Sequence, residues 1–384
     1  MAQPKILYIG FVPKGPSLMR KLAGISRYCA ARGWEAVPIE RGDAKPQALA
    51  GVFRRHSPLA GCVVDGVDNN VHLPPRLFRG VPVSYIGYMR GRTGRYPNFH
   101  FNTGAIVETA FRELAAGRPS CYAAVGYPCH TRWADQRVAA FRATAAAHGA
   151  KCLAFPLRHR HGGETWAAFA ARLVPWLAAL PEHCAIFAVS DSVAVRVAAA
   201  ARTARRHIPR SITLVSVDNF RELCDGADTP VTSIELDFER AGFLAAKALG
   251  KFTAPTPILI DPLLVVRRKS TSGRGRHEPW ILEAVEIIRR EACGGLTASR
   301  LLDRFPQSRR NFERRFREAM GHSILDEILG VRLEAATTLL AQTDTAIAAI
   351  PDMCGFQTYR ALDFHFRSRF KMGLGAWREM HTHT

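Results

Sequence analysis

The sequence predicts an α/β protein with two doubly wound parallel-sheet subdomains, followed by a smaller all-α domain. Three observations lead to this prediction. Over residues 1–266, short apolar runs bounded by turn residues alternate with helical patterns, as they do in βαβ units. A stretch rich in Gly, Ser and Arg follows. Beyond it the strand-like runs stop, and helical periodicity continues almost to the end of the chain.

Each element of the α/β half follows from its local pattern. Apolar runs of strand length are expected to be buried strands of parallel sheets. They cover residues 5–12, 34–40, 61–67, 81–88, 122–128, 152–157, 184–190 and 212–218. Helical patterns separate most of these runs, at residues 17–32, 102–116, 131–148, 165–180, 191–206 and 237–250. We expect Asn102 and Asp191 to cap the helices that begin beside them.

The length of the chain also requires more than one domain. It has 384 residues, and a single hydrophobic core rarely grows past about 250–300 residues. We expect a first domain at residues 1–266, an exposed linker at 267–279 and a helical domain at 280–384.

Composition excludes several classes of protein. No apolar run reaches the roughly 20 residues of a membrane span. The first residues show no charged segment followed by an apolar core and a cleavage site, so we expect a cytoplasmic protein. The formal net charge is +20, which favours a polyanionic partner. The excess is spread over the chain, with +14 on residues 1–266 and +6 on residues 267–384.

The residues with reactive side chains do not indicate an enzyme. The nine cysteines form no CxxC pair, so neither disulfides nor a zinc site are expected. The histidines at 159–161 and in the C-terminal HTHT are interpreted as solvated. The segment GFVPKGPS at 10–17 nearly matches a phosphate-binding loop, but Pro16 stands where the loop needs Lys. Nothing in the sequence calls for a catalytic residue, a cofactor or a metal.

The segment at 296–323 predicts two helices joined by a short turn. Thr297 is a candidate N-cap of the first helix and Ser308 of the second. Phe312 and Phe316 lie four residues apart on one face of the second helix and should pack inward. The other face is rich in Arg, which suits a DNA major groove. The candidate DNA-binding residues are Ser308, Arg309, Arg310, Asn311, Arg314 and Arg317.

A weaker second copy follows at 343–372. A helix from about 345 leads to a turn at Gly355, and Thr358 is the candidate N-cap of the next helix. Leu362 and Phe366 should face inward. Pro351 falls inside the first of these helices, where proline costs about 3 kcal/mol or kinks the helix. The candidate DNA-binding residues here are Thr358, Tyr359, Arg360 and Arg367.

These two units resemble the AraC/XylS family of DNA-binding domains. The resemblance rests on their spacing of about 50 residues along a chain of helix pairs and on CGFQTYRALDFHFRSRF at 354–370, which is similar to the family's GF…F…FK signature. Pro351, Ala361, Leu362 and Leu374 depart from the family pattern. The resemblance therefore implies base recognition by the first unit, and mainly phosphate contacts by the second.

The first half resembles the effector domains of the LacI/GalR family, which are similar to periplasmic sugar-binding proteins. The evidence is IFAVSDSVAVRVAAAARTARRHIPRSITLVSVDNF at 186–220, together with the segments at 229–249 and 265–271. In this fold, ligands bind between the subdomains at the carboxyl ends of the strands. The resemblance implies ligand-binding roles for Asp218, Arg137, Ser190, Trp133, Phe11 and Asn219.

Together the two resemblances imply a sugar-responsive transcription regulator. Its partners would be paired DNA half-sites, a monosaccharide effector such as xylose or another pentose, RNA polymerase and a second copy of the chain. We expect activation of a carbohydrate operon, and another sugar or sugar derivative is the alternative effector. A transporter's sugar-binding protein and a sugar-phosphate enzyme on the same fold are the competing classes.

Overall fold

The computed structural model describes most of the chain. The described residues are 2–11, 15–40, 42–43, 45–66, 73–78, 80–88, 93–129, 131–157, 164–251, 256–271, 279–320, 322–342, 345–370 and 372–382. The histidines at 159–161, interpreted from the sequence as solvated, and the linker residues 272–278 lie outside them. The chain divides into two compact units, Met1–His277 and Glu278–Thr384.

The first unit contains two lobes, each built on one sheet. The first lobe's sheet has the order β11-β5-β4-β3-β1-β2, and all its paired strands are parallel. Its strands are β1 (Lys5–Phe11), β2 (Glu35–Glu40), β3 (Leu59–Asp65), β4 (Val83–Ile86), β5 (Asn98–Phe101) and β11 (Ile258–Ile260). Its helices are α1 (Pro16–Ala30), α2 (Leu49–Arg55), α8 (Phe238–Lys247) and the 3-10 turn η1 (Pro75–Phe78).

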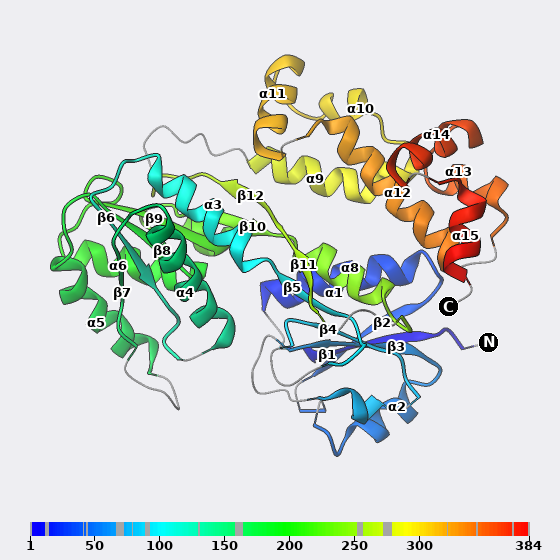
Figure 1. The fold of residues 1–384 in the computed structure, drawn as a ribbon, viewed down its shortest axis with the longest axis horizontal. Helices are drawn as coiled ribbons and strands as arrows, with labels where there is room; N and C mark the ends of the chain where they lie inside the picture. The colour runs from blue at the N-terminus through cyan, green and yellow to red at the C-terminus, as the bar shows by residue number, and fades with distance from the viewer. Residues whose placement is uncertain are drawn as a thin grey trace. The chain divides into compact units, whose positions relative to one another are not determined.

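The second lobe repeats this plan with the order β12-β10-β9-β8-β6-β7, in which only β12 is antiparallel to its neighbour among the described strands. Its strands are β6 (Cys121–Val125), β7 (Cys152–Ala154), β8 (Cys184–Ala188), β9 (Ile212–Asp218), β10 (Thr232–Leu236) and β12 (Pro262–Val266). Its helices are α3 (Thr103–Ala115), α4 (Arg132–Ala147), α5 (Trp166–Ala178), α6 (Asp191–Thr203) and α7 (Arg221–Gly226). Helices α3 and α4 cover one face of the sheet, and α5 and α6 cover the other (Figure 1).

The expected pair of doubly wound sheets is therefore present, and its strands are apolar on both faces because helices cover both. In β1, Ile6 and Tyr8 pack toward α1 and α8, while Leu7 and Ile9 pack toward α2. All four side chains are fully buried. A parallel strand with two covered faces needs such a continuous apolar run.

In its described part, the chain passes between the lobes three times, after β5, after β10 and between β11 and β12. Two of these crossings are fixed to each other by Asn102. Its backbone N–H donates to the carbonyl of Ile260 at 2.8 Å, and its side chain donates to Asp261 at 2.7 Å. The Asn102 side chain also accepts from the backbone of Ala105, which confirms the predicted N-cap of α3.

The predicted cap at Asp191 is wrong. Ser190 is the N-cap residue of α6, and Asp191 is the first helical residue. Its buried carboxylate instead accepts hydrogen bonds from the neighbouring strands, as described below.

The stretch after β12 is also less exposed than the predicted linker. Arg268 and Ser270 are buried, and they bond to the carbonyls of Val231 and Leu214 in the second lobe. The described part of this stretch is therefore held by the lobe from which it leaves.

The second unit is helical throughout its described part. Its helices are α9 (Pro279–Glu291), η2 (Ala292–Gly294), α10 (Ala298–Leu302), α11 (Arg309–Met320), α12 (Ile324–Gln342), η3 (Ile347–Ala349), α13 (Ile350–Met353), α14 (Tyr359–Phe370) and α15 (Leu374–Thr382). The Thr297 side chain accepts from the backbone of Arg300, and Thr358 accepts from Ala361. These two of the predicted caps are confirmed.

Pro351 does not interrupt a helix. The helix predicted from about residue 345 is a 3-10 turn followed by the short α13, and Pro351 lies in the first turn of α13. The backbone N–H groups of a first turn have no intrahelical acceptor, so proline loses nothing there. The predicted penalty is therefore wrong.

Candidate functional site

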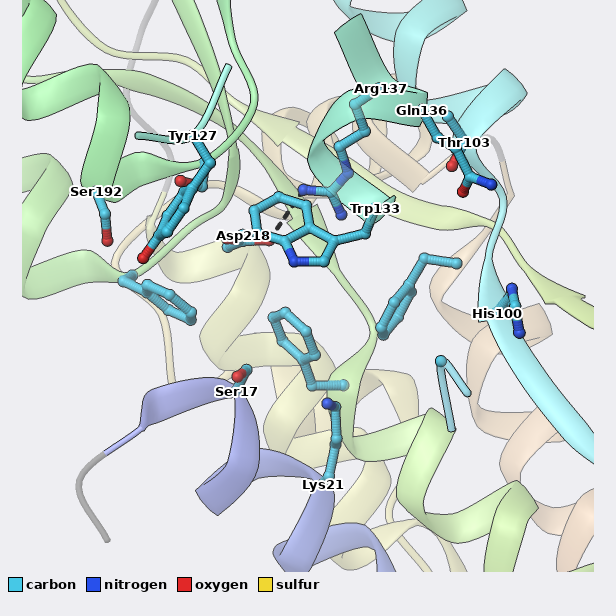
Figure 2. Close-up of a pocket in the computed structure, with 15 residues that line it drawn as sticks. Ser17, Lys21, His100, Thr103, Tyr127, Trp133, Gln136, Arg137, Ser192 and Asp218 are labelled. Carbon is cyan, nitrogen blue, oxygen red and sulfur yellow. Dashed lines mark ion pairs between the residues drawn. The ribbon is translucent and has the colours of Figure 1, made fainter. Parts of the chain in front are cut away.

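A pocket of about 260 Å³ lies between the two lobes of the first unit, at the carboxyl ends of its strands. Figure 2 shows its side chains converging from both lobes. The lining residues are Ser17, Lys21, Gly87, His100, Phe101, Thr103, Tyr127, Trp133, Gln136, Arg137, Ser190, Ser192, Asp218, Phe220 and Phe238.

An ion pair between Arg137 and Asp218 forms the second lobe's side of the pocket. Their side chains are 7% and 13% exposed, and Nη1 of Arg137 lies 3.6 Å from Oδ1 of Asp218. The same Nη1 donates to the carbonyl of Val189 at 2.7 Å, which fixes the guanidinium at the end of β8. The guanidinium of Arg137 and the carboxylate of Asp218 both line the pocket. Such charged groups make strong, directional hydrogen bonds to hydroxyl groups.

Asp218 is held in an unusual state by its surroundings. Burial raises the pKa of its carboxyl to about 7, and the charge of Arg137 opposes that shift. Its backbone φ is +105°, and the φ of Asn219 is +51°. Non-glycine residues rarely adopt such angles, and those that do cluster at functional sites.

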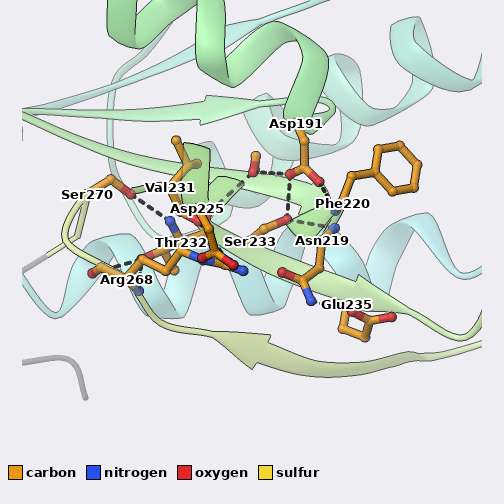
Figure 3. A network of polar contacts seen from close by, with 11 residues as sticks. Asp191, Asn219, Phe220, Asp225, Val231, Thr232, Ser233, Glu235, Arg268 and Ser270 are labelled. Carbon is orange, nitrogen blue, oxygen red and sulfur yellow. Dashed lines mark hydrogen bonds and ion pairs between the residues drawn. The ribbon is translucent and has the colours of Figure 1, made fainter. Parts of the chain in front are cut away.

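A network of hydrogen bonds behind the pocket fixes this turn (Figure 3). The carboxylate of Asp191 accepts from the hydroxyls of Ser216 and Ser233 and from the backbone N–H of Phe220. Asp191 is fully buried, so burial raises its pKa while these donors lower it. Its charge also raises the pKa of Asp218.

The first lobe contributes Lys21 and His100. The Nζ of Lys21 lies 2.6 Å from Oδ2 of Asp65, which also accepts a hydrogen bond from the hydroxyl of Tyr8 at 2.6 Å. The Lys21 side chain is only 1% exposed. Burial lowers the pKa of His100, and its Nε2 has no hydrogen-bond partner among the described residues. A buried polar atom without a partner marks a place where a ligand group can bind.

Aromatic rings surround these polar groups. The guanidinium of Arg137 lies 5.0 Å from the centre of the Trp133 ring, and Trp133 packs on Tyr127 at 5.6 Å. On the opposite side, Phe238 packs against Phe101 at 5.1 Å and against Phe220 at 6.1 Å. An apolar pocket with a few convergent polar groups is the common form of a small-molecule site.

The structure places some of the predicted ligand-binding residues in the pocket lining and others outside it. Asp218, Arg137, Ser190 and Trp133 line the pocket, and the Ser190 hydroxyl has no partner among the described residues. Asn219 does not line it, because its side chain donates to Glu235 at 2.6 Å. The side chain of Phe11 lies outside the described part of the chain.

Sequence reasoning missed Lys21 and His100. Lys21 lies in the helix that follows the first strand, and His100 lies in β5, next to a crossing between the lobes. Their nearness to the carboxyl ends of the strands was the available signal. Neither residue stands in a motif.

The second unit presents an Arg-rich helix. On α11, Phe312 and Phe316 are fully buried as predicted, and Trp280 packs on Phe312 at 4.3 Å. The Arg side chains on the other face are exposed and partly held within the helix. Arg314 donates to Glu318 at 2.6 Å and to Asn311 at 3.1 Å. The other exposed residues of this face are Ser308, Arg309, Arg310 and Arg317.

The second copy has the same construction around α14. Leu362 and Phe366 are fully buried as predicted, while Tyr359 is 48% exposed. Thr358 and Arg360 are also exposed. Arg367 is paired with Asp363 at 2.7 Å within the helix.

Helix α12 joins the two copies. Arg332 from this helix donates to the carbonyls of Ala292 and Leu296 at 2.9 Å and 2.8 Å. Its guanidinium also lies 5.7 Å from the ring centre of Phe356, beside the turn of the second copy.

Comparisons with known proteins match parts of both units. A periplasmic binding protein-like domain family matches residues 120–271, and a helix-turn-helix domain family matches residues 301–380. Fold and sequence therefore define a DNA-binding transcription regulator with a periplasmic-binding-protein-like domain.

More particularly, the chain resembles xylose operon regulatory proteins along most of its length. It is 28% identical over 302 residues to that of Haemophilus influenzae, covering 76% of this chain and 78% of the relative. It is 29% identical over 301 residues to that of Escherichia coli K12, covering 76% of each.

Solved structures confirm the fold over the whole chain. The xylose-binding transcription activator xylR matches with a TM-score of 0.57 at 23% identity, covering 99% of both chains. A lac repressor dimer bound to operator matches with a TM-score of 0.55 at 15% identity, covering 71% of this chain and 95% of the repressor.

Two kinds of feature are absent from the described residues. Among the described residues, no helix combines the length and the apolar character that crossing a bilayer requires. Within the same ranges, no three His, Cys, Asp or Glu side chains are grouped so that they could hold a metal ion.

Proposed function

We propose that this chain is a cytoplasmic, sugar-responsive regulator of a carbohydrate utilisation operon, and that it has no enzymatic activity. The observation that carries the proposal is the pocket between the lobes. It combines the Arg137–Asp218 ion pair with aromatic rings, in a chain that also contains two helix-turn-helix copies. Because two relatives are named xylose operon regulatory proteins, xylose is the first effector to test, followed by other pentoses.

In this proposal, the second lobe supplies most of the effector's polar contacts. Asp218 accepts hydrogen bonds from sugar hydroxyls, Arg137 donates to ring or hydroxyl oxygens, and Ser190 does either. Trp133 stacks on the C–H face of the sugar. Asn219, although predicted to touch the effector, instead supports the turn from behind.

Lys21 and His100 act from the first lobe. Because Lys21 is paired with Asp65 and burial lowers the pKa of His100, these groups read hydroxyl positions rather than attract an anion. A sugar that contacts both lobes favours their closed arrangement.

The proposed output is a change in DNA binding by a homodimer on two half-sites. Arg309, Arg310 and Arg314 on α11 enter the major groove, with Ser308, Asn311 and Arg317 at its edges. On α14, Thr358, Tyr359, Arg360 and Arg367 mainly contact phosphates. Contact with RNA polymerase would make the regulator an activator. A coupling of about 1–3 kcal/mol between sugar and DNA sites is sufficient for control.

Thermal unfolding against a panel of pentoses, hexoses and their phosphates tests the effector. Binding to the native state adds about 2.7 kcal/mol of stability at one hundred times the dissociation constant. We expect a selective rise in the midpoint with one neutral sugar, and that same sugar should change the affinity for operator DNA. If no sugar raises the midpoint, the proposed sugar response is wrong. If a sugar binds without changing DNA affinity, the proposed regulation is wrong.

A further inference from the structure

Glu235 touches both lobes at one of the three crossings. It is the penultimate residue of β10, directly before the chain leaves the second lobe for α8. Its side chain is 1% exposed. A buried carboxylate is stable only when charged or polar groups satisfy it. The partners of Glu235 come from different lobes.

On the second lobe's side, Glu235 holds the turn that carries Asp218. Its Oε2 accepts from Nδ2 of Asn219 at 2.6 Å, a contact whose two residues are labelled in Figure 3. The backbone N–H of Asn219 also donates to the hydroxyl of Ser233 at 3.0 Å. Asp218 and Asn219 both have positive φ angles. Such a backbone persists only where surrounding contacts hold it, and Glu235 supplies one of those contacts.

On the first lobe's side, Glu235 is paired with Arg20 of α1. An Nη2 of Arg20 donates to Oε1 of Glu235, and it also lies 3.4 Å from the carbonyl of Leu236 in the crossing segment. The guanidinium stands 5.3 Å from the ring centre of Phe238, which lines the pocket. Arg20 itself is not a lining residue. If the first lobe moves relative to the second, the Arg20–Glu235 ion pair must therefore either stretch or carry Glu235 with it.

We propose that Glu235 is a positioning residue that couples the placement of the lobes to the shape of the pocket. Arg20 holds the carboxylate in place from the first lobe, and the carboxylate holds Asn219 and thereby the Asp218 turn in the second. The part of this inference that concerns effector binding rests on the proposed function. The coupling itself exists without an effector.

Hydrogen–deuterium exchange on the ligand-free full-length protein tests the coupling directly. In Arg20→Gln, we expect peptides covering 216–222 in the second lobe to exchange about tenfold faster than in wild type. The matched control is Arg27→Gln, which removes another cation of α1. Its partner Glu239 lies on α8 in the same lobe, at 3.3 Å. The control should leave exchange at 216–222 unchanged. Unchanged exchange in Arg20→Gln, or an equal increase in both variants, would overturn the proposal.

A double substitution separates coupling from general loosening. Glu235→Gln keeps an oxygen that can accept from Asn219 but removes the charge that needs Arg20. The double variant Arg20→Gln/Glu235→Gln should therefore exchange no faster than Glu235→Gln alone. Additive increases would show that the two residues act independently, and they would refute the coupling. Glu235→Gln also decides the question if Arg20→Gln does not fold, since it should then exchange faster than wild type at 216–222.

The effector adds a second readout. With xylose as the probe, Arg20→Gln should weaken binding at least about fivefold, as for an allosteric coupling of ordinary size. Arg27→Gln should bind as wild type does. If wild type binds xylose and Arg20→Gln binds it equally well, the coupling is wrong. If wild type binds no sugar, the proposed effector is wrong, and the exchange experiment still decides the coupling.

Discussion

Gly24 of α1 and Gly242 of α8 face each other's helix so closely that neither position has room for a methyl group. A Cβ at Gly24 would overlap the carbonyl oxygen of Glu239, and a Cβ at Gly242 would overlap that of Lys21. The two helices thus meet backbone to backbone. This contact places Arg20 and Lys21, which lie one turn before Gly24, beside the pocket.

Gly24→Ala should destabilise the first unit by about 2 kcal/mol, because overpacking forces the helices apart. Urea unfolding measures the loss. Gly51→Ala is the matched control, since Gly51 lies in α2 with open space around it. At Gly51, alanine should raise the free energy of unfolding by about 0.5–1 kcal/mol, because glycine weakens a helix interior. Equal effects at both positions would contradict the close contact.

Effector affinity should rise with pH around neutrality. Burial raises the pKa of Asp218 to about 7, and Arg137 and Lys21 oppose the shift while Asp191 and Glu235 add to it. If the ionised carboxylate accepts the sugar hydroxyls, affinity should increase about tenfold between pH 6 and pH 8, following ionisation in the free protein. Titration calorimetry across this range measures it. In Asp218→Asn the dependence should vanish and binding should be weak at every pH.

The same group should affect stability in the opposite sense. Its folded pKa is above its unfolded value of about 4, so between about pH 4 and pH 7 the native state holds a proton that the unfolded chain has lost. The contribution of Asp218 to the free energy of unfolding is therefore largest in acid and falls as pH rises through this window. Unfolding of wild type and Asp218→Asn at pH 5 and pH 8 should show this difference.

Arg314→Ala should weaken operator binding by about 1–3 kcal/mol if this side chain reads a base. The arginine is 53% exposed and paired with Glu318 in the free helix, so binding DNA requires only that it exchange this partner. Fluorescence anisotropy with the operator gives the affinity. Arg290→Ala removes an equal charge from α9, on a side chain paired with Glu291. That control should keep specific binding, and a similar loss would indicate that charge alone matters.

Gly355→Ala should unfold or loosen the second helix-turn-helix copy. Gly355 has a φ of +75°, and a Cβ there would lie 2.7 Å from the carbonyl oxygen of Ala292. Strain at such a position costs about 1–3 kcal/mol before any clash is counted. DNA affinity should fall while sugar binding stays unchanged. Gly330→Ala, in open space on α12, is the control and should leave DNA binding intact.

The regular parts of the fold could be predicted because their signals are local. Buried strands such as β1 and β9 are long apolar runs, and α11 carries its two Phe side chains at helical spacing. The runs expected as strands omit β5, β10, β11 and β12. These strands have three to five residues. Length alone does not hide a strand, since β7 has only three residues and lies in an expected run. In β5 and β10, polar residues interrupt the apolar pattern, and pairing with neighbouring strands is what makes them strands.

Among the described side chains, the pocket lining was predictable only in the second lobe, where a family pattern pointed to Arg137 and Asp218. Lys21 could not be found in the same way, because its partner Asp65 and its neighbour Phe238 come from distant segments. Asp191 was misread for a related reason. A carboxylate at the start of a helix usually caps that helix. Here the Asp191 carboxylate instead accepts hydrogen bonds from the hydroxyls of Ser216 and Ser233 in adjacent strands.

The three crossings between the lobes also determine when each lobe can be finished during synthesis on the ribosome. The first lobe needs α8 to cover α1, and it needs β11 to close its sheet at Ile260. The second lobe needs β12, which ends at Val266. Although translation proceeds from the N-terminus, both lobes therefore await the same late stretch of chain and are completed almost together. Neither lobe of the first unit can therefore fold completely until most of that unit has been synthesised. During this period chaperones have the greatest opportunity to bind it.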